Sequence, residues 1–174
     1  MSIGGPHPDP DPAEGIAANG LPRESVWDYP RPPSLRDEPR LVTVAFAGTE
    51  IARSDRAVKI SETAGPPVVY VPPEDVSEGA LQPAGGLTLC EWKGNATYFD
   101  VVAGGERAAR AAWTYPKPNP TYESIRDWIA FYPGRVECML GDERVRPQPG
   151  EFYGGWITAE ITGPFKGVPG SGGW

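Results

Sequence analysis

The sequence predicts a mainly β fold with one or two short helices. Glycine and proline, with 22 residues each, make up about a quarter of the 174 residues, and this composition is typical of a chain with many turns and ordered loops. Short runs of alternating apolar residues lie between these turns and indicate strands. A chain of this length can bury a single core.

We expect three parts along the chain. Residues 1–25 are rich in Pro, Gly and Asp, and this segment is expected to be flexible or held on the surface, because it has little apolar area to bury. Residues 26–40 form an extended proline-rich arm, whose Trp27 and Tyr29 either pack on the domain or close over a ligand site. Residues 41–174 form one β domain, and its Gly/Pro-rich extension from about residue 147 is expected to pack on it because of its aromatic side chains.

Four strands are predicted in the first half of the domain. Residues 41–46 alternate as a half-buried strand does, and a turn at residues 47–50 leads into a hairpin partner at 51–54. Residues 57–63 and 68–71 follow, and the fourth strand stops at Pro72 and Pro73. Pro73 and the two acidic residues after it suit the first turn of a short helix that reaches about Leu81.

The central pair of strands is predicted at residues 87–92 and 97–102. A further strand at 107–115 ends at three closely spaced prolines, and residues 119–128 then suit a short helix with Asn119 as its cap. Residues 129–132 and 135–140 are predicted to pair as a last hairpin around Pro133 and Gly134.

Charge and hydropathy oppose several classes of partner. The formal net charge of -7 and the pI of about 4.8 disfavour attraction to nucleic acid phosphates. No apolar run is long enough to span a membrane, and the N-terminal residues lack the basic start and apolar centre of a signal peptide. We therefore expect a cytoplasmic protein with no nucleic acid or membrane partner, and the sequence does not indicate its oligomeric state.

Cysteine and histidine are scarce. Cys90 and Cys138 are the two cysteines and His7 is the one histidine. Without an export signal, free thiols are expected rather than a disulfide. A zinc site needs more thiol or imidazole ligands than these, so no metal and no cofactor is predicted. A Ser-His-Asp or Cys-His catalytic set cannot be assembled around a single histidine in the N-terminal segment.

Several motifs in the central stretch carry a family resemblance. CEWKGNATYF, AAWTYPKP and WIAFY resemble domain-of-unknown-function family 427, a small bacterial and fungal domain also labelled nucleotidyltransferase-like. The resemblance continues in SDRAVKISET, VVYVPPEDV, FYGGWIT and GPFKG, so it covers roughly residues 41–174. It implies a β-tent-like architecture in which two antiparallel sheets meet at an angle. Some β-tent relatives carry a zinc site of cysteines, a pattern from which this sequence departs.

The candidate ligand-binding residues are mainly aromatic and have polar neighbours. Aromatic rings provide area for stacking, and polar tips can orient a small molecule. For each ring, ordinary core packing is the alternative, and this holds for Trp156 as well. The candidate set is Arg56, Glu62, Tyr70, Cys90, Trp92, Lys93, Tyr98, Trp113, Tyr115 and Tyr132.

The polar candidates each have two readings. Cys90 is either a small apolar residue of the core or a nucleophile with Lys93 as its activating neighbour. Lys93 is either a solvated turn residue or a group that binds an anion or forms a carbonyl adduct. Arg56 and Glu62 either pair with each other or contact a ligand.

Three functions are consistent with these features. The leading hypothesis is a small-molecule binding domain with an aromatic-lined pocket and a ligand of unknown identity. A nucleotidyltransferase-like enzyme, implied by the family label, would require carboxylates that hold a divalent metal and a glycine-rich phosphate loop, whereas the acidic residues here are scattered. A protein-interaction module that uses the WDYPRPP arm is the third.

Overall fold

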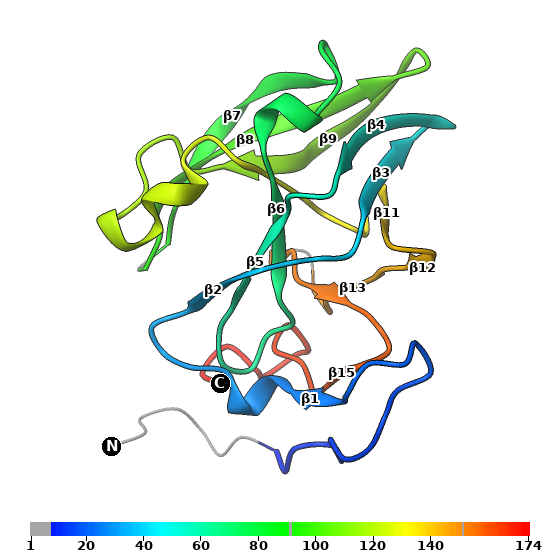
Figure 1. The fold of residues 1–174 in the computed structure, drawn as a ribbon. Helices are drawn as coiled ribbons and strands as arrows, with labels where there is room; N and C mark the ends of the chain where they lie inside the picture. Colours follow the sequence, from blue (N-terminus) through cyan, green and yellow to red (C-terminus); the bar gives the residue numbers. More distant parts are fainter. Residues whose placement is uncertain (1–7, 91, 151) are drawn as a thin grey trace.

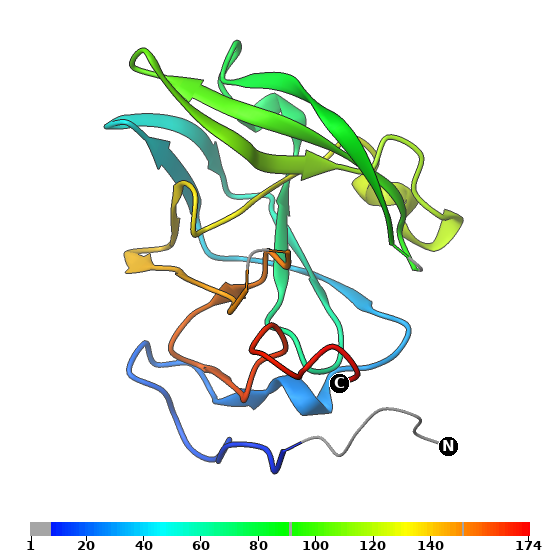
Figure 2. The ribbon, with the colours of Figure 1, turned by 180° about the vertical axis from the view of Figure 1, so that it is seen from behind.

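The computed structural model describes residues 8–90, 92–150 and 152–174, and their fold is mainly β, as the sequence predicts (Figures 1 and 2). Two larger antiparallel sheets and two small two-stranded sheets make up the described part. Its helical segments are the short 3₁₀ helices η1 (Val26–Asp28), η2 (Pro73–Asp75) and η3 (Pro120–Ile125). The pair of antiparallel sheets implied by the resemblance is therefore present.

The larger sheet has seven strands and extends from the top of the view in Figure 1 to its middle. In spatial order its strands are β2 (Ser34–Asp37), β5 (Val58–Ser61), β6 (Val68–Val71), β10 (Ile129–Phe131), β9 (Glu106–Thr114), β8 (Gly94–Ala103) and β7 (Leu81–Cys90). The β7–β8–β9 meander is the predicted central pair with the strand that follows it. Strand β2, from the proline-rich arm, forms one edge of this sheet.

The second sheet has four strands and packs against the first. Its order is β12 (Glu143–Arg144), β11 (Glu137–Leu140), β3 (Val42–Phe46) and β4 (Thr49–Ser54). The two-stranded sheets pair β13 (Arg146–Pro147) with β14 (Trp156–Ile157), and β1 (Glu24–Ser25) with β15 (Ile161–Thr162).

Strand alternation gives the seven-stranded sheet two different faces. On β6, Val69 and Val71 join the core between the two sheets, whereas Tyr70 belongs to an aromatic cluster on the opposite face. On β10, Phe131 faces the inter-sheet core and Ala130 faces the aromatic cluster. Because successive side chains of a strand point to opposite faces, one sheet separates a mainly aliphatic core from a mainly aromatic one.

The predicted last hairpin is wrong. Strand β10 pairs with β6 and β9 in the seven-stranded sheet, whereas β11 pairs with β3 and β12 in the other one. The chain therefore crosses between the sheets in the segment from Tyr132 to Val136. Two bonds shape this crossover: the backbone N–H groups of Arg135 and Val136 both donate to the carbonyl oxygen of Tyr132.

Both predicted helices are shorter than expected. Helix η2 ends at Asp75 because Val76 adopts an extended conformation and bridges to Ala52 on β4. Helix η3 ends at Ile125, and Asp127 then adopts a positive φ of 64°. The backbone N–H of Asp127 donates to the carbonyl oxygen of Tyr115, so contact with the end of β9 replaces a further helical turn.

Residues 8–29 lie along the C-terminal part of the chain, at the bottom of the view in Figure 1. Tyr29 and Val26 are buried with Ile161, and Trp27 packs on Trp174 with ring centroids 5.5 Å apart. The indole N–H of Trp27 also donates to the carbonyl oxygen of Pro164. The arm therefore packs its aromatic side chains on the domain, which was one of its two readings.

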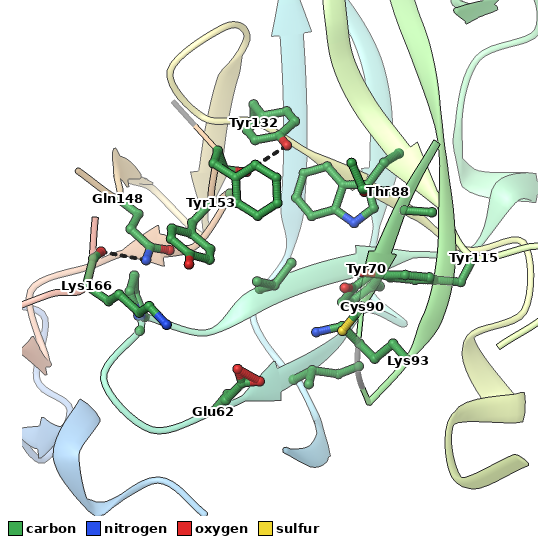
Figure 3. A pocket seen from close by; sticks show the side chains of 18 of the residues that line it. Glu62, Tyr70, Thr88, Cys90, Lys93, Tyr115, Tyr132, Gln148, Tyr153 and Lys166 are labelled. Atoms are coloured by element: carbon green, nitrogen blue, oxygen red, sulfur yellow. Dashed lines mark hydrogen bonds between the residues drawn. The ribbon is translucent and has the colours of Figure 1, made fainter. Parts of the chain in front are cut away.

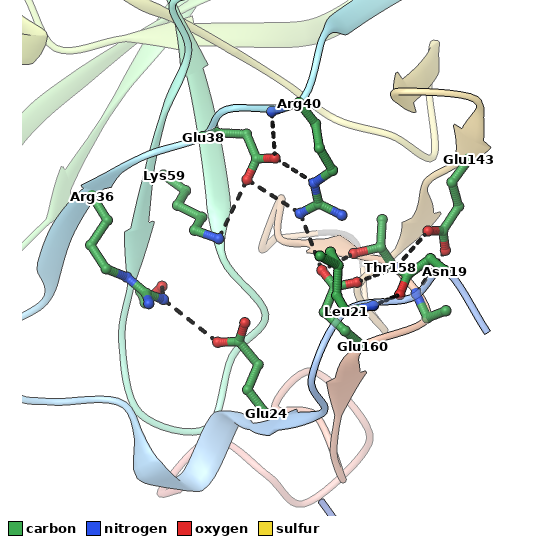
Figure 4. A network of polar contacts seen from close by, with 12 residues as sticks. Asn19, Leu21, Glu24, Arg36, Glu38, Arg40, Lys59, Glu143, Thr158 and Glu160 are labelled. Atoms are coloured by element: carbon green, nitrogen blue, oxygen red, sulfur yellow. Dashed lines mark hydrogen bonds and ion pairs between the residues drawn. The ribbon is translucent and has the colours of Figure 1, made fainter. Parts of the chain in front are cut away.

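A network of buried charges joins five separate segments (Figure 4). Glu38, which is 1% exposed, accepts hydrogen bonds from Arg40 and lies 3.3 Å from Lys59 Nζ on β5. Arg40 also pairs with Glu160 at 3.1 Å, and Glu160 accepts a bond of 2.6 Å from Asn19. Asn19 donates a second bond to Glu143 on β12. These contacts fix the N-terminal segment and the arm relative to both sheets.

Two further findings concern the described residues as a whole. None of their helices has the length and apolar character needed to cross a lipid bilayer. Cys90 and Cys138 are both free thiols, Cys90 half-buried and Cys138 fully buried in the inter-sheet core.

Candidate ligand pocket

A cavity of about 270 Å³ lies on the aromatic face of the seven-stranded sheet (Figure 3). Most of the sequence-predicted site residues line it. These are Glu62, Tyr70, Cys90, Lys93, Tyr98, Trp113, Tyr115 and Tyr132. The arm, residues 26–40, contributes none of the cavity's lining side chains in the described part, so the arm does not close over this cavity.

The floor of the cavity is one row of side chains across neighbouring strands. Ala130 on β10 stands opposite Tyr70 of β6 on one side and Trp113 of β9 on the other, and Tyr98 of β8 stands opposite Trp113. Directly opposed residues of antiparallel strands share a face. Tyr70, Trp113 and Tyr98 line the cavity from this row, whereas Ala130 lies between Tyr70 and Trp113 in the register and is not among the lining residues of the described part.

Ring contacts hold the aromatic side chains of the cavity in place. Tyr70 and Trp113 make an edge-to-face contact with centroids 6.5 Å apart, and Trp113 lies 4.6 Å from Tyr132. The guanidinium groups of Arg110 and Arg135 cover Tyr98 and Tyr132 at 4.0 and 4.3 Å from the ring centroids. Such contacts add to the energy of simple burial, so these rings form a preformed surface for stacking.

Lys93 brings a charge to one end of the cavity. It is in the turn between β7 and β8 and only 8% exposed, with its Nζ 5.9 Å from the centroid of the Tyr115 ring. Asn119 fixes this turn: its backbone N–H donates to the carbonyl oxygen of Lys93, and its side chain donates to that of Trp92. A lysine can bury its stem while the ammonium group stays accessible, and here the cavity supplies that access.

The hydroxyl of Tyr70 is fully buried and has no hydrogen-bond partner among the described residues. Burial raises the pKa of Tyr70, with a smaller contribution from Cys90, although Trp113 and Tyr115 approach the oxygen and oppose this shift. Burial likewise raises the pKa of Tyr115. Both phenols therefore stay protonated at neutral pH and can donate hydrogen bonds. A buried hydroxyl without a partner is costly to the fold, so this group favours a ligand with an acceptor atom.

The far wall of the cavity comes from the C-terminal extension. The hydroxyl of Tyr132 donates to the carbonyl oxygen of Phe152, and Gln148 donates to the carbonyl oxygen of Lys166 and accepts from the N–H of Gly155. Gly154 lets this wall approach the sheet, because a Cβ atom there would overlap the ring of Trp113.

Exposed side chains form the rim of this wall. Phe152 is 61% exposed and makes an edge-to-face contact with Tyr153 at 5.0 Å. Lys166 lies over the other ring, with its Nζ 5.4 Å from the centroid of Tyr153. The rim therefore presents apolar area and a second ammonium group to an entering molecule.

Comparison with known families supports the resemblance seen in the motifs. Residues 34–142 match the family described as a domain of unknown function (DUF427) and labelled NTP_transf_9. The chain belongs to this family. The DUF427 match covers well over half of the 174 residues and includes both larger sheets except β12. No curated protein matches the sequence.

The DUF427 segment supplies only part of the cavity. The sheet floor and the polar end lie within residues 34–142, whereas Gln148, Phe152, Tyr153, Gly154 and Lys166 lie outside that range. The opposite wall is thus built by residues beyond the family match.

The NTP_transf_9 label implies a divalent metal, and the cavity residues do not fit one. Glu62 is the one carboxylate among the described lining residues. In the described ranges of the chain, no three His, Cys, Asp or Glu side chains lie close enough together to hold a metal ion. The usual ligands of Mg²⁺ are carboxylate and other oxygen donors, so we derive no metal-assisted step for this site.

Two predicted residues lie outside the cavity lining. Trp92 packs, half-buried, against the aromatic cluster. Arg56 pairs with Asp75 at 3.0 Å and lies 3.8 Å from Glu74, so its proposed pairing with Glu62 does not occur. Trp156 is also outside: it is buried in the inter-sheet core, and its indole N–H donates to the carbonyl oxygen of Phe131.

Sequence reasoning missed several lining residues. Thr88 lies on β7 and shares a hydrogen bond of 2.7 Å with the hydroxyl of Tyr98. Gln148, Phe152, Tyr153 and Lys166 come from the extension. The aromatic pair in the motif FYGGWIT is the signal that could have found this wall, because large rings in a glycine-rich segment need a surface to cover.

Proposed function

We propose that this DUF427 protein is a small-molecule binding domain whose ligand stacks on the aromatic floor of the cavity. The observation that carries this proposal is the combination of a cavity of about 270 Å³, a floor of buried aromatic rings and the lining residue Tyr70, whose buried hydroxyl has no partner among the described residues. Such sites are mostly apolar and use a few polar groups for orientation. The volume, at the lower end of typical ligand sites, suits a compact planar molecule.

The polar groups of the cavity suggest how the ligand is oriented. Lys93, Tyr70 and Tyr115 offer donors at one end, whereas Glu62 offers an acceptor. A ligand with a carbonyl or carboxylate oxygen at one end of a planar body would satisfy these donors. The acidic pI of about 4.8 supports a small molecule rather than a nucleic acid as the partner.

A thermal-shift screen with defined probes tests the proposal. The probes are benzamide, benzoate, benzyltrimethylammonium, and ATP with and without Mg²⁺. A probe at about a hundred times its Kd adds roughly 2.7 kcal/mol to the free energy of unfolding, which raises the Tm by several degrees. We expect metal-independent stabilisation by an aromatic carbonyl compound. Stabilisation by ATP only in the presence of Mg²⁺ would instead support the nucleotidyltransferase-like alternative.

Two matched tryptophan variants locate the binding site. Trp113→Phe removes part of the cavity floor, whereas Trp92→Phe changes a tryptophan that does not line the cavity. We expect the first variant to weaken binding of the stabilising probe about tenfold, on the scale of a lost stacking contact, and the second to leave the affinity unchanged. Equal affinity in both variants would place the ligand elsewhere.

A further inference from the structure

The cavity brings a thiol next to its hydrogen-bond donors. Cys90 is the last residue of β7, and it stands opposite Gly94 on β8. Gly94 has no side chain, and the backbone of residues 117–119 lies next to where one would be, 3.1 Å away at the carbonyl oxygen of Lys117. Figure 3 shows the Cys90 sulfur beside Lys93 and Tyr70 at one end of the cavity.

The two cysteines of the chain differ sharply in their surroundings. Cys90 is half-buried and lines the cavity. Cys138 is inaccessible in the inter-sheet core, where burial raises the pKa of its thiol. A thiol reacts as its thiolate and only where a reagent reaches it. Cys138 is therefore an internal control for any reaction at Cys90.

The donors beside Cys90 match a particular kind of electrophile. When a thiolate adds to a carbon–carbon double bond conjugated to a carbonyl group, negative charge develops on the carbonyl oxygen. Tyr70, whose buried hydroxyl has no partner in the described residues, and Lys93 line the same end of the cavity as Cys90. Preorganised donors aimed at developing charge accelerate a reaction, because they need no reorganisation when the charge forms.

We propose that Cys90 is a nucleophile that forms thioethers with α,β-unsaturated carbonyl compounds bound in this cavity, while Tyr70 and Lys93 hold the carbonyl oxygen. This inference rests on the proposed function, because the electrophile must first occupy the ligand pocket. The sulfur forms a bond to the β-carbon, and the π electrons of the double bond move toward the carbonyl oxygen to give an enolate. A proton from water then adds to the α-carbon, and the thiol proton has passed to water, so the net change is addition of S–H across the double bond.

Two alkylating reagents separate this role from simple accessibility. N-ethylmaleimide adds through an enolate, whereas iodoacetamide reacts by displacement of iodide and develops no enolate oxygen. Intact-protein and peptide mass spectrometry would give the rate of each reaction at Cys90 and at Cys138 in the full chain. The reference is the ratio of the two rates at Cys90 after unfolding in urea, where no cavity exists.

We expect a single fast adduct at Cys90, with Cys138 unmodified until the protein unfolds. In the folded protein the ratio of the maleimide rate to the iodoacetamide rate should exceed the unfolded reference by roughly tenfold or more, the scale of one hydrogen bond to a developing charge. Tyr70→Phe should return this ratio toward the reference and leave the iodoacetamide rate within about twofold. Tyr122→Phe is the matched control, because Tyr122 is not among the described lining residues and its hydroxyl donates to the carbonyl oxygen of Pro33, and it should leave the ratio unchanged.

A folded ratio equal to the unfolded reference would overturn the proposal, as would a ratio that Tyr70→Phe does not change. If Tyr70→Phe fails to fold, Lys93→Gln in the β7–β8 turn provides the same test. An unchanged rate ratio in that variant would contradict the proposal that Lys93 holds the carbonyl oxygen. The thermal-shift screen repeated on Cys90→Ser separates the two proposals. If Cys90→Ser still binds the probe and the wild-type rate ratio equals the unfolded reference, only the covalent step is rejected. If probe binding is absent and the wild-type ratio also equals the reference, the ligand pocket itself is rejected.

Discussion

The hydroxyl of Tyr132 donates a hydrogen bond of 2.9 Å to the carbonyl oxygen of Phe152. Tyr132 follows β10 in the seven-stranded sheet, and Phe152 lies in the C-terminal extension. The bond therefore joins the floor of the cavity to its far wall, from opposite sides of the chain crossover between the two sheets.

Tyr132→Phe should loosen this wall without removing the ring. Loss of one partly buried hydrogen bond costs about 1 kcal/mol of unfolding free energy, which corresponds to a Tm decrease of about 2–4 °C for a domain of this size. Urea denaturation measures the change. Tyr153→Phe is the control, since its side chain is largely at the rim, and it should have almost no effect. Equal losses in both variants would contradict the proposed role of the Tyr132 bond.

Gly154→Ala should disturb the cavity directly. An added methyl group would overlap the indole ring of Trp113 and come within 3.3 Å of the Tyr132 ring, and overpacking of this kind typically costs about 1–3 kcal/mol. We expect a lower Tm and weaker binding of the stabilising probe. Gly172→Ala, where the new Cβ meets nothing within 4 Å, should leave both values unchanged. A normal Tm and normal binding in Gly154→Ala would show that the extension does not pack on Trp113.

Acid should weaken the buried charge network at Glu160. Burial alone would raise the pKa of Glu160, but hydrogen bonds from Thr158 and Asn19 and the charge of Arg40 hold it below its usual value. Because the folded-state pKa is depressed, this stabilisation is complete above the unfolded-state value of about 4.5 and is lost as the pH falls through the folded-state pKa. Melting curves at decreasing pH should show the Tm falling in that range.

The variant Glu160→Gln tests which group is responsible. Removing one partner of a buried ion pair costs about 3–5 kcal/mol, so we expect a lower Tm at neutral pH and a weaker dependence on acid. Glu123→Gln on η3 removes an exposed ion pair with Arg126, and it should change the Tm little because surface pairs contribute little. An acid profile that is identical in wild type and Glu160→Gln would assign the effect to other carboxylates.

Alkaline titration should reveal the buried tyrosines. Burial, helped by Tyr98, raises the pKa of Tyr132 to about 12, and burial also raises the pKa of Tyr70 and Tyr115. The folded state therefore keeps these protons, and the resulting stabilisation is complete below the unfolded-state pKa of about 10 and is lost as the pH rises. The near-ultraviolet absorbance of tyrosinate should show fewer than seven groups ionising near pH 10 while circular dichroism stays native. Complete ionisation near that pH with the fold retained would contradict this prediction.

The strands were predictable where alternation and turn residues agreed. The strand predicted at residues 68–71 has the same bounds as β6, because two prolines stop it and its apolar residues serve both faces of the sheet. The partner of a strand was harder to predict. Pro133 and Gly134 can turn a hairpin or redirect the chain to another sheet, and the local sequence is compatible with both. Only the long-range packing of Ile129 and Phe131 in the inter-sheet core distinguishes them.

The candidate site was predictable where aromatic side chains lay within predicted strands. Tyr70, Tyr98 and Trp113 share a face because of strand periodicity and register, and their aromatic character marked them from the start. The pairing of Arg56 with Asp75 was not predictable, because the two residues are nineteen positions apart and the sequence gives no register between them. The wall formed by Gln148 and Lys166 depends on how the extension folds back, which no periodic pattern encodes.

The cavity has two walls of different origin, and this separates stability from specificity. The floor belongs to the seven-stranded sheet, whose other face holds the main core, so most changes there would also affect folding. The far wall belongs to a glycine-rich extension that leaves this sheet largely intact when its side chains change. Substitutions at Phe152, Tyr153 or Lys166 should therefore change which ligands the cavity prefers while the seven-stranded sheet keeps its fold.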